Sequence, residues 1–485
     1  MGELMAYKYY KDNRRYIDAL LETGDVVVVN EEVDWDLEMG AIVRRMCEKQ
    51  SPAAYFKKIK EYPGFEALGG PIATHRRLAI AFGLDPATSV RDISAEYLKR
   101  TAGKPLPPKV IDRKDAPCKE IVLMGDDADL LNLPAPMVHD GDGGRYICTW
   151  HFVVAKDLDT SAINWGMYRQ MLFDEKTMVG PVLPFSDMGK MFHNKYAPRN
   201  IPMPFATVIN PDPLSAIASC APAAIPEDEF TSLLMGEPVE VVKCETCDLY
   251  VPAHAEIIIE GVVVPNVSIE EAPFGEYTGY RTSPREKRTV YRVKAITMRK
   301  KPIMPISNMG VPTDEGQLLR AFSLGLEMER ILKDQGIPVT GVYMLPESTH
   351  HLVVVGVKPI YANIATQIGQ LVFGSKLGPW FHLVVVVDDK TDIYSKDELI
   401  HALSTKCHPV TGIRVTEHGV GTPLNPFVGP EERRLGTAPK VVFDCLFPIH
   451  WPASDVPIKV SFDTVYPKEI QEKVLSKWRT YGFTD

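Results

Sequence analysis

The stretch Glu271-Ala-Pro-Phe-Gly-Glu-Tyr-Thr-Gly-Tyr280 interrupts the β-rich middle of the chain. Pro273 has no backbone N–H and fixes its own φ, while Gly275 can adopt conformations closed to other residues. We therefore expect a turn that directs the carboxylates of Glu271 and Glu276 into one space. On residue types alone, two interpretations are open: the acid/base loop of an enzyme, or a solvated acidic turn.

On both sides of this stretch the sequence favours short strands over helices. Residues 113–312 contain apolar and β-branched runs separated by turn signals, with few segments of helical length. The runs include Ala206 to Ile209, Val239 to Lys243, Ala255 to Val264 and Thr289 to Met298. This pattern predicts a barrel or sandwich of antiparallel character.

The flanking parts of the chain alternate helices with strands. Residues 1–112 begin with a helix, a strand and a helix, and end at the proline-rich linker Lys104-Pro-Leu-Pro-Pro-Lys-Val. In residues 313–485 we expect helices and near-continuous valine strands, which are typical of a sheet buried on both faces. The helices expected there are Glu315 to Gln335, Ile360 to Phe373, Asp397 to Ser404 and the amphipathic terminal segment from Pro467 to Trp478. We therefore predict a central β domain between two α/β domains, the last of which takes part in oligomerisation.

Composition excludes several classes of protein. The 485 residues are 45% hydrophobic and 24% charged, with a formal net charge of −9, which argues against a general nucleic-acid binder. No apolar run approaches the ~20 residues of a membrane span, and the start of the chain has no apolar signal segment. Cys244 and Cys247 form a single C-x-x-C, which is half of a zinc site. We expect a cytoplasmic protein without a membrane partner, with its cysteines as thiols.

Arg169, in Asn164-Trp-Gly-Met-Tyr-Arg169, is the natural partner of the two carboxylates. An arginine fork can hold one carboxylate bidentately while a second nearby acid is pushed toward its protonated form. The alternative is an ordinary surface salt bridge.

A more dispersed set consists of Asn164, His193 and Glu240, an amide, an imidazole and a carboxylate. Such mainly hard ligands suit Mn²⁺ or Mg²⁺ better than structural zinc, although a lone histidine is usually a satisfied polar residue. Lys243 and Lys376 could each hold a phosphate or be simply solvated. The chain contains no P-loop, no G-x-G-x-x-G after a first strand and no nucleophile elbow.

Several long motifs resemble the UbiD family of prenylated-flavin-dependent decarboxylases, in the family's order and over nearly the whole chain. They are Asn164-Trp-Gly-Met-Tyr-Arg, Val241-Val-Lys-Cys-Glu-Thr-Cys-Asp-Leu-Tyr-Val-Pro-Ala253, Glu271-Ala-Pro-Phe-Gly-Glu-Tyr-Thr-Gly-Tyr, Phe373-Gly-Ser-Lys-Leu-Gly and Val387-Asp-Asp-Lys-Thr-Asp-Ile-Tyr. The final segment from Tyr466 to Phe483 looks most like the ferulic acid decarboxylase branch.

The resemblance implies a central split β-barrel of the flavin reductase type, within an α+β and α/β multidomain protein. It implies prenylated FMN, supplied by a flavin prenyltransferase, with Mn²⁺ or Mg²⁺ at the flavin phosphate and K⁺ nearby. The metal ligands by position are Asn164, His193 and Glu240, and Lys376 matches a lysine near the phosphate. The remaining cofactor-binding positions are Trp165, Met167, Tyr168, Arg169 and Phe192.

By the same resemblance, Arg169, Glu271 and Glu276 form the catalytic network, with Glu276 as the proton donor. The expected reaction is the reversible decarboxylation of an α,β-unsaturated, aromatic or heteroaromatic acid by a homodimer or larger homo-oligomer. The alternatives are a carboxylase of anaerobic aromatic degradation and a flavin-binding protein without catalysis.

The expected substrate pocket departs from a plain cinnamate slot. Its positions are Tyr277, Gly316, Arg320, Pro379, Thr422 and Leu424. Arg320 stands where an apolar residue is expected and would meet a second polar group on the substrate; alternatively, it turns to solvent or pairs internally. Gly316 and Pro379 replace bulkier residues, which would admit a larger or differently shaped acid.

Overall fold

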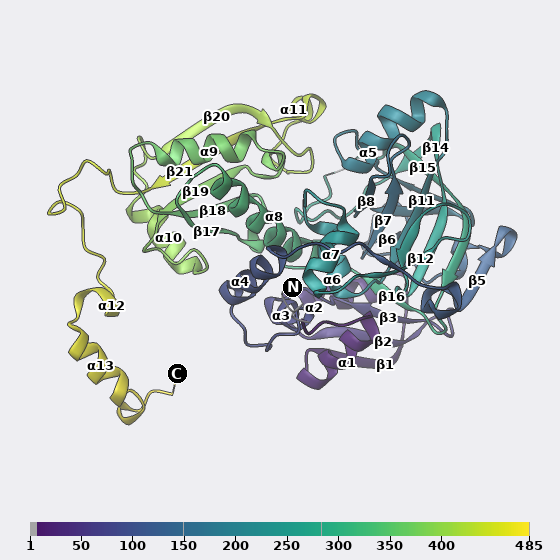
Figure 1. Ribbon diagram of the computed structural model, residues 1–485, viewed down its shortest axis with the longest axis horizontal. Coiled ribbons are helices and arrows are strands. Elements are labelled where there is room, and N and C mark those ends of the chain that lie inside the picture. Colours follow the sequence, from purple (N-terminus) through teal and green to yellow (C-terminus); the bar gives the residue numbers. More distant parts are fainter. Residues whose placement is uncertain (1–6, 149, 283, 485) are drawn as a thin grey trace.

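The computed structural model describes residues 7–148, 150–282 and 284–484. Figure 1 shows the C-terminal α/β part beside the N-terminal and central parts, with a terminal segment extending away from them. The mixed α/β multidomain architecture predicted from the sequence is confirmed.

The central part is a sheet of nine strands in the order β6-β9-β10-β15-β14-β11-β7-β8, with β5 paired to β15. All these pairs are antiparallel, as the sequence predicts. The strands are β5 (Ile121–Met124), β6 (Tyr146–Cys148), β7 (His151–Lys156), β8 (Ile163–Gly166), β9 (Gln170–Asp174), β10 (Thr177–Gly180), β11 (Met203–Ile209), β14 (Ile257–Glu271) and β15 (Glu286–Met298). Among the described residues β6 and β8 end this path without pairing to each other, so the split-barrel description stays a prediction.

The acidic stretch quoted above connects the two longest strands of this sheet. β14 and β15 pair as far as Glu271 opposite Glu286, and the loop between them leaves the sheet at that end. Helices are more frequent in this part than the sequence indicated, because short helices cover the strand ends. They are α5 (Asp187–Met191), α6 (Pro213–Cys220) and α7 (Glu227–Met235), with a small sheet of β4 (Lys109–Val110), β12 (Glu240–Lys243) and β13 (Tyr250–Pro252) beside them.

The N-terminal part is a four-stranded sheet, β1-β2-β3-β16, with helices packed on it. Its strands are β1 (Val26–Val33), β2 (Ala53–Ile59) and β3 (Glu66–Gly69), and its helices are α1 (Asn13–Thr23), α2 (Glu38–Glu48), α3 (His75–Ala81) and α4 (Val90–Thr101). The fourth strand, β16 (Ile303–Ile306), comes from the end of the central part and pairs parallel to β3. Because β16 completes the N-terminal sheet, it joins the N-terminal and central parts of the molecule. The chain then continues to the start of α8.

The C-terminal sheet is buried on both faces, as its valine runs predict. The sheet order is β17-β18-β19-β21-β20, with the three central strands parallel. The elements are α8 (Glu315–Asp334), β17 (Val339–Met344), β18 (Leu352–Val357), α9 (Ile364–Gly374), β19 (Leu383–Asp388), α10 (Lys396–Thr405), β20 (Ile413–Val420), α11 (Pro430–Leu435) and β21 (Thr437–Cys445). Alternate valines of β18 and β19 pack on α9 and on α10.

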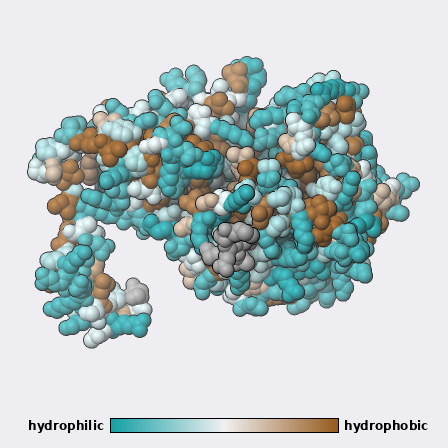
Figure 2. All heavy atoms as spheres, in the orientation of Figure 1, coloured by the Kyte–Doolittle hydropathy of each residue, from teal (hydrophilic) through white to brown (hydrophobic). Residues whose placement is uncertain are grey.

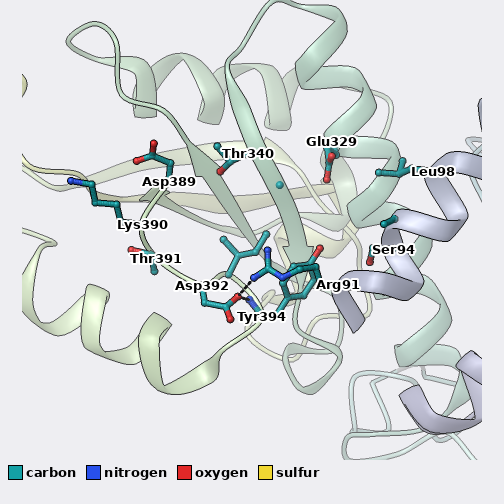
Figure 3. Close-up of a pocket in the computed structure, with 13 residues that line it drawn as sticks. Arg91, Ser94, Leu98, Glu329, Thr340, Asp389, Lys390, Thr391, Asp392 and Tyr394 are labelled. Carbon is teal, nitrogen blue, oxygen red and sulfur yellow. Dashed lines mark hydrogen bonds and ion pairs between the residues drawn. The ribbon is translucent and has the colours of Figure 1, made fainter. Parts of the chain in front are cut away.

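A cavity of about 390 Å³ lies where α4 meets the C-terminal part. Figure 3 shows Arg91 of α4 beside Asp392 and Tyr394, and the Arg91 Nη2 to Asp392 Oδ1 distance is 2.8 Å. The cavity contains none of the residues predicted for the active site. Within the described ranges, no helix is both long enough and apolar enough to cross a membrane.

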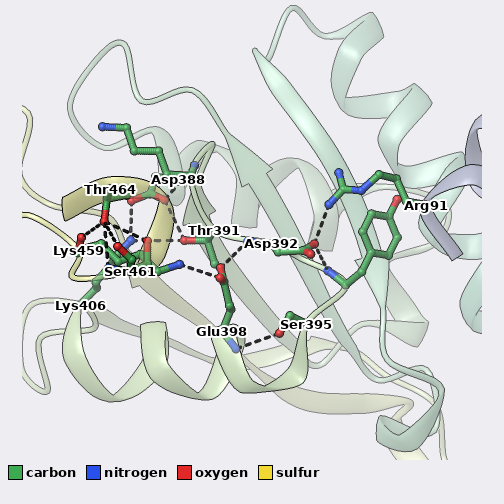
Figure 4. Close-up of polar contacts among 12 residues, drawn as sticks. Arg91, Asp388, Thr391, Asp392, Ser395, Glu398, Lys406, Lys459, Ser461 and Thr464 are labelled. Carbon is green, nitrogen blue, oxygen red and sulfur yellow. Dashed lines mark hydrogen bonds and ion pairs between the residues drawn. The ribbon is translucent and has the colours of Figure 1, made fainter. Parts of the chain in front are cut away.

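The terminal segment carries α12 (Phe462–Val465) and α13 (Lys468–Lys477). Figure 4 shows its attachment point, where Lys459 Nζ donates to Glu398 Oε1 of α10 at 2.7 Å. No residue of α13 is buried, and apolar side chains show as brown spheres along the segment in Figure 2.

Candidate active site

Arg169, between β8 and β9, joins the two acids of the loop after β14. Its Nε and Nη2 donate to Glu271 Oε1 and Oε2 at 2.8 and 3.0 Å, the parallel geometry of a bidentate ion pair. Its Nη1 contacts Glu276 Oε1. Since Glu271 is fully buried and Glu276 is 3% exposed, the interpretation as a solvated acidic turn is wrong. Arg169 is likewise not a surface salt-bridge residue.

The surroundings hold Glu271 as a fixed acceptor. Tyr146 Oη donates to Glu271 Oε1 at 2.6 Å, and Arg288 Nε lies 3.9 Å from Oε2. Burial, reinforced by the charge of Glu271, raises the pKa of Tyr146, so that the phenol keeps its proton and donates it to this bond. Burial opposes the charge of Arg169, but the two glutamates outweigh it and raise the pKa of Arg169 above its ordinary value. The guanidinium is therefore a permanent cation whose orientation Glu271 sets.

Gly275 is required in this loop by space rather than by its φ. A Cβ atom there would lie 2.5 Å from the ring of His139. The left-handed φ values in this stretch belong instead to Ala272, at 75°, and Gly279, at 82°. The loop therefore requires glycine at position 275 because the His139 ring comes close, and not because of the conformational freedom expected of Gly275.

His139 and Asp142 stabilise the loop through hydrogen bonds. Asp142 Oδ1 accepts from Gly275 N at 2.9 Å, and its Oδ2 lies 2.9 Å from His139 Nδ1. The other ring nitrogen lies 2.7 Å from Asn308 Oδ1. Burial lowers the pKa of His139, but hydrogen bonding to Asp142 outweighs it and the net shift is upward. With an acceptor at each nitrogen, the imidazolium form satisfies both contacts.

The three expected metal ligands do not converge. His193 Nε2 lies 2.7 Å from the carbonyl oxygen of Val182 and borders a cavity of about 490 Å³. Glu240 borders a different cavity of about 320 Å³, where Lys11, Lys109 and His254 contact its carboxylate. The hydrogen bond with Lys11 is the main cause that lowers the pKa of Glu240 to about 2. Glu240 is thus already neutralised by cationic neighbours, and neither cavity is lined by Asn164.

Asn164 has a different acidic neighbourhood, which the sequence reasoning missed. Glu227, the first residue of α7, accepts from the backbone N–H of Trp165 at 2.8 Å. Burial and, to a lesser degree, the charge of Asp187 raise the pKa of Glu227 to about 7. A bound cation would relieve this unfavourable burial. The signal in the sequence was Pro226-Glu-Asp-Glu, an acidic helix start, which alone is unremarkable.

Asp187 connects this neighbourhood to Lys376, since its Oδ2 lies 3.2 Å from Lys376 Nζ. Tyr168 Oη accepts from Asn164 Nδ2 at 3.4 Å and from Met188 N at 3.3 Å. Amide and carboxylate oxygens beside a lysine fit a hard divalent cation and a phosphate group.

The other expected cofactor positions fall into two groups. Met167 Sδ lies 3.5 Å from Cys220 Sγ at the end of α6, on the side of the turn that faces α8. The rings of Trp165 and Phe192 instead belong to the core, 2% and 4% exposed, with Trp165 stacked on Phe152. Trp165 Nε1 is a buried donor without a hydrogen-bond partner among the described residues, which fits an acceptor on a bound group.

Residues of the expected substrate pocket meet around Tyr277 and Trp380. Tyr277 Oη lies 3.4 Å from Thr422 Oγ1, and Thr422 Oγ1 accepts from Leu424 N. Arg320 places its guanidinium 4.2 Å from the centroid of Trp380, next to Pro379. Gly316, in the first turn of α8, would bring a Cβ 3.3 Å from Asp314 Oδ1. The guanidinium of Arg320 thus packs on an aromatic ring.

A cluster of three histidines beside this pocket was missed by the sequence reasoning. His350 stacks on Tyr277 with centroids 4.4 Å apart, and His351 and His382 follow at successive centroid distances of 5.3 and 5.0 Å. Both nitrogens of the fully buried His350 lack hydrogen-bond partners among the described residues. Burial lowers the pKa of His351 to about 4 and of His382 to about 3, so these imidazoles are neutral. His350 and His351 are adjacent in the sequence, but nothing in the sequence connects them with Tyr277.

Comparisons with known proteins agree over the whole chain. A family model described as the 3-octaprenyl-4-hydroxybenzoate carboxy-lyase Rift-related domain matches residues 109–312, and the N-terminal and C-terminal domain models of that carboxy-lyase match residues 17–97 and 317–445. The chain is 31% identical to the pyrrole-2-carboxylic acid decarboxylase of Pseudomonas aeruginosa, over 98% of this chain and 99% of that protein. It is also 31% identical to ferulic acid decarboxylase 1 of Saccharomyces cerevisiae, over 97% and 98%.

Solved structures show the same relationship. The closed form of vanillic acid decarboxylase from Sedimentibacter hydroxybenzoicus matches with a TM-score of 0.87 and 29% identity, over 97% of this chain and 99% of that one. An evolved dimeric form of the UbiD-class enzyme HmfF from Pelotomaculum thermopropionicum, in complex with prFMN, matches with a TM-score of 0.78 and 25% identity, over 92% and 97%. The resemblance noted in the sequence is confirmed, and this protein belongs to the UbiD family of carboxy-lyases.

Proposed function

We propose that the protein catalyses the reversible, non-oxidative decarboxylation of an α,β-unsaturated, aromatic or heteroaromatic carboxylic acid, with prenylated FMN as its cofactor. The observation that carries this proposal is Arg169, whose side chain is 12% exposed, held bidentately by Glu271 and contacted by Glu276 at its third nitrogen. Relatives that are named as decarboxylases of pyrrole-2-carboxylic and ferulic acid support the substrate class.

The chemistry requires an electron sink, because loss of CO₂ leaves an electron pair on carbon and no side chain can accept it adequately. Prenylated FMN supplies that sink when it is bound. Arg169 orients the substrate carboxylate, and Glu276 gives its proton to the carbon that loses CO₂. A carboxylate substrate adds negative charge beside Glu276, which favours the protonated form needed for this step. Glu276 then recovers a proton from water.

For the cation we propose Asn164, Asp187 and Glu227 as oxygen ligands of Mn²⁺ or Mg²⁺, with Lys376 at the flavin phosphate. The raised pKa of Glu227 and its proximity to Asp187 support this set, which replaces the one expected from the sequence. The K⁺ ion and the prenyltransferase that supplies the cofactor stay predictions.

A matched pair of variants tests the cation site. After reconstitution, Glu227→Gln is expected to lose bound Mn²⁺ in electron paramagnetic resonance, since the amide removes the charge. Glu240→Gln is expected to keep it, because Glu240 pairs with Lys11, Lys109 and His254. The opposite result would restore Glu240 as a ligand.

For the substrate we propose a ring-containing acid with a second hydrogen-bonding group directed at Arg320 and His350. Both nitrogens of His350 lack hydrogen-bond partners among the described residues, and the guanidinium of Arg320 lies over the ring of Trp380. Arg320→Met should lower kcat/KM for hydroxylated or heteroaromatic acids by about 10- to 100-fold, the effect of one or two lost polar contacts, and leave plain aryl acrylic acids less affected. An unchanged substrate profile would remove Arg320 from the pocket.

The overall proposal is tested by producing the protein together with a flavin prenyltransferase, reconstituting it with Mn²⁺ and K⁺, and measuring CO₂ release from acrylic, aryl and heteroaryl acids. Turnover of any of these supports it. Bound prenylated FMN without turnover of any acid would contradict it and favour a flavin-binding role.

We also propose a homodimer or larger homo-oligomer. α13 presents Ile470 and Leu475, 42% and 63% exposed, and none of its residues is buried by its own chain. A second copy of the chain is the partner that would cover these apolar side chains.

A further inference from the structure

The single C-x-x-C of the chain, Cys244-Glu-Thr-Cys247, has no role in the site described above. It forms the turn between β12 and β13, where Lys243 pairs with Tyr250. The two sulfur atoms and one carboxylate oxygen of Glu260, on β14, lie within 4.8 Å of one another. Two readings of this cluster are open, a metal site and a pair of thiols that react with each other.

Glu260 is not available as a metal ligand. Its Oε1 accepts from Lys119 Nζ at 2.9 Å and from Glu245 N at 3.0 Å. Its Oε2 accepts from the backbone N–H of Thr246 at 2.8 Å and from the hydroxyl of Thr246 at 3.0 Å. The carboxylate is therefore saturated, and the fully buried ammonium of Lys119 beside it repels a divalent cation. What Glu260 does is hold the backbone of the turn between the two cysteines.

The turn makes the two thiols unequal. Cys244 is 6% exposed, whereas Cys247 is half-buried and accessible to a small reagent. The hydrogen bond from Cys244 lowers the pKa of Cys247, while the same contact and burial raise the pKa of Cys244. An accessible thiol that ionises first, next to a buried partner, is the arrangement of an attacking and a resolving cysteine.

We propose that Cys244 and Cys247 form a reversible dithiol–disulfide pair that exchanges with small-molecule disulfides of the glutathione type. The Cys247 thiolate attacks one sulfur of the small disulfide, the S–S bond breaks, and one thiolate leaves. Cys244 then loses its proton and attacks the Cys247 sulfur, which releases the second thiolate. The two leaving thiolates take up the two protons, so one protein disulfide forms as one small disulfide is reduced to two thiols.

The test uses the full-length protein, equilibrated with reduced and oxidised glutathione over a range of ratios, then acid-quenched, alkylated and digested with trypsin. Both cysteines lie in the peptide that starts after Lys243 and ends at Arg281. We expect this peptide to lose two hydrogen atoms and to carry no glutathione at oxidising ratios. In Cys244→Ser the glutathione adduct should accumulate on Cys247, whereas in Cys247→Ser the reaction of Cys244 should be at least about 10-fold slower.

The control is Cys407→Ser, which removes a different half-buried thiol and should leave the behaviour of the pair unchanged. Thermal unfolding of each serine variant at the wild-type temperature shows that the fold is intact. The proposal is overturned if both cysteines remain alkylated at the most oxidising ratio. It is also overturned if the reduced wild-type protein retains one Zn²⁺ per chain through dialysis and Cys247→Ser does not.

Discussion

At the scale of single residues, Glu271 and Glu276 are identical side chains in different surroundings. Glu271 receives two donors from Arg169 and one from Tyr146, which fixes it as an acceptor. Glu276 sits on the neighbouring loop, at the remaining nitrogen of the same guanidinium. A proton donor must alternate between two charge states, and in the function proposed above that role belongs to Glu276.

Substitution of Glu276 and substitution of Glu271 should produce different kinetic defects. Glu276→Gln should lower kcat by at least about 100-fold, the usual contribution of a positioned acid, without loss of bound cofactor. Glu271→Gln keeps the donor but loosens Arg169, so KM should rise together with a smaller fall in kcat. Steady-state CO₂ release and the flavin absorption spectrum of each variant check this. Near-normal turnover by Glu276→Gln would assign the proton to another group.

His139 gives a pH dependence at the same scale. Its pKa in the folded protein is raised above the ordinary value of 6.5, so its protonated form stabilises the fold. This contribution is complete below pH 6.5 and is lost as the pH rises through the higher folded-state pKa. The difference in unfolding temperature between wild type and His139→Gln should therefore narrow as the pH rises from 6 to 9. A constant difference would mean that His139 stays neutral.

At the scale of elements, the loop between β14 and β15 depends on one close approach. Gly275→Ala would place a methyl group 2.5 Å from the His139 ring, and the loop or the ring must move. We expect a loss of about 1–3 kcal/mol in stability, as for an overpacked site, and a larger loss of activity because Glu276 is the next residue. Gly374→Ala is the control, since its Cβ would meet no atom within 4 Å. If the two variants had the same unfolding temperature and the same turnover, the loop would have rearranged to accommodate the added methyl group.

The elements themselves were largely predictable, because their signals are local. The helix expected at the start of residues 1–112 is α1, and the valine runs became strands buried on both faces. The contacts of Arg169 with Glu271 and Glu276 followed from motif resemblance, because Arg169 and Glu271 are remote in the chain. The carboxylate of Glu240, predicted as a metal ligand, instead pairs with Lys11, which is 229 residues away in the chain, and no local pattern in the sequence predicts that pairing. The histidine cluster is of the same kind, assembled from residues just before β18 and β19 and from the loop after β14.

At the scale of the whole molecule, the terminal segment carries apolar side chains that its own chain leaves exposed. It is tied back by Lys459 and Glu398, while α13 exposes Ile470 and Leu475. Large apolar side chains that their own chain leaves uncovered are typical of an interface. A second copy that covers them would release ordered water from both faces and hold each terminal segment in place.

Ile470→Glu combined with Leu475→Glu should therefore convert the oligomer to a smaller species, measured as molar mass by light scattering during size exclusion. Lys473→Glu, a charge change on the same helix at an exposed position, should leave the mass unchanged. Each subunit keeps its own Arg169, Glu271 and Glu276, so a monomeric double variant is expected to retain the flavin spectrum on reconstitution. If the double variant keeps the wild-type mass, α13 is not the interface, and the apolar residues near Ile458 and Val460, 76% and 83% exposed, become the surface to change next.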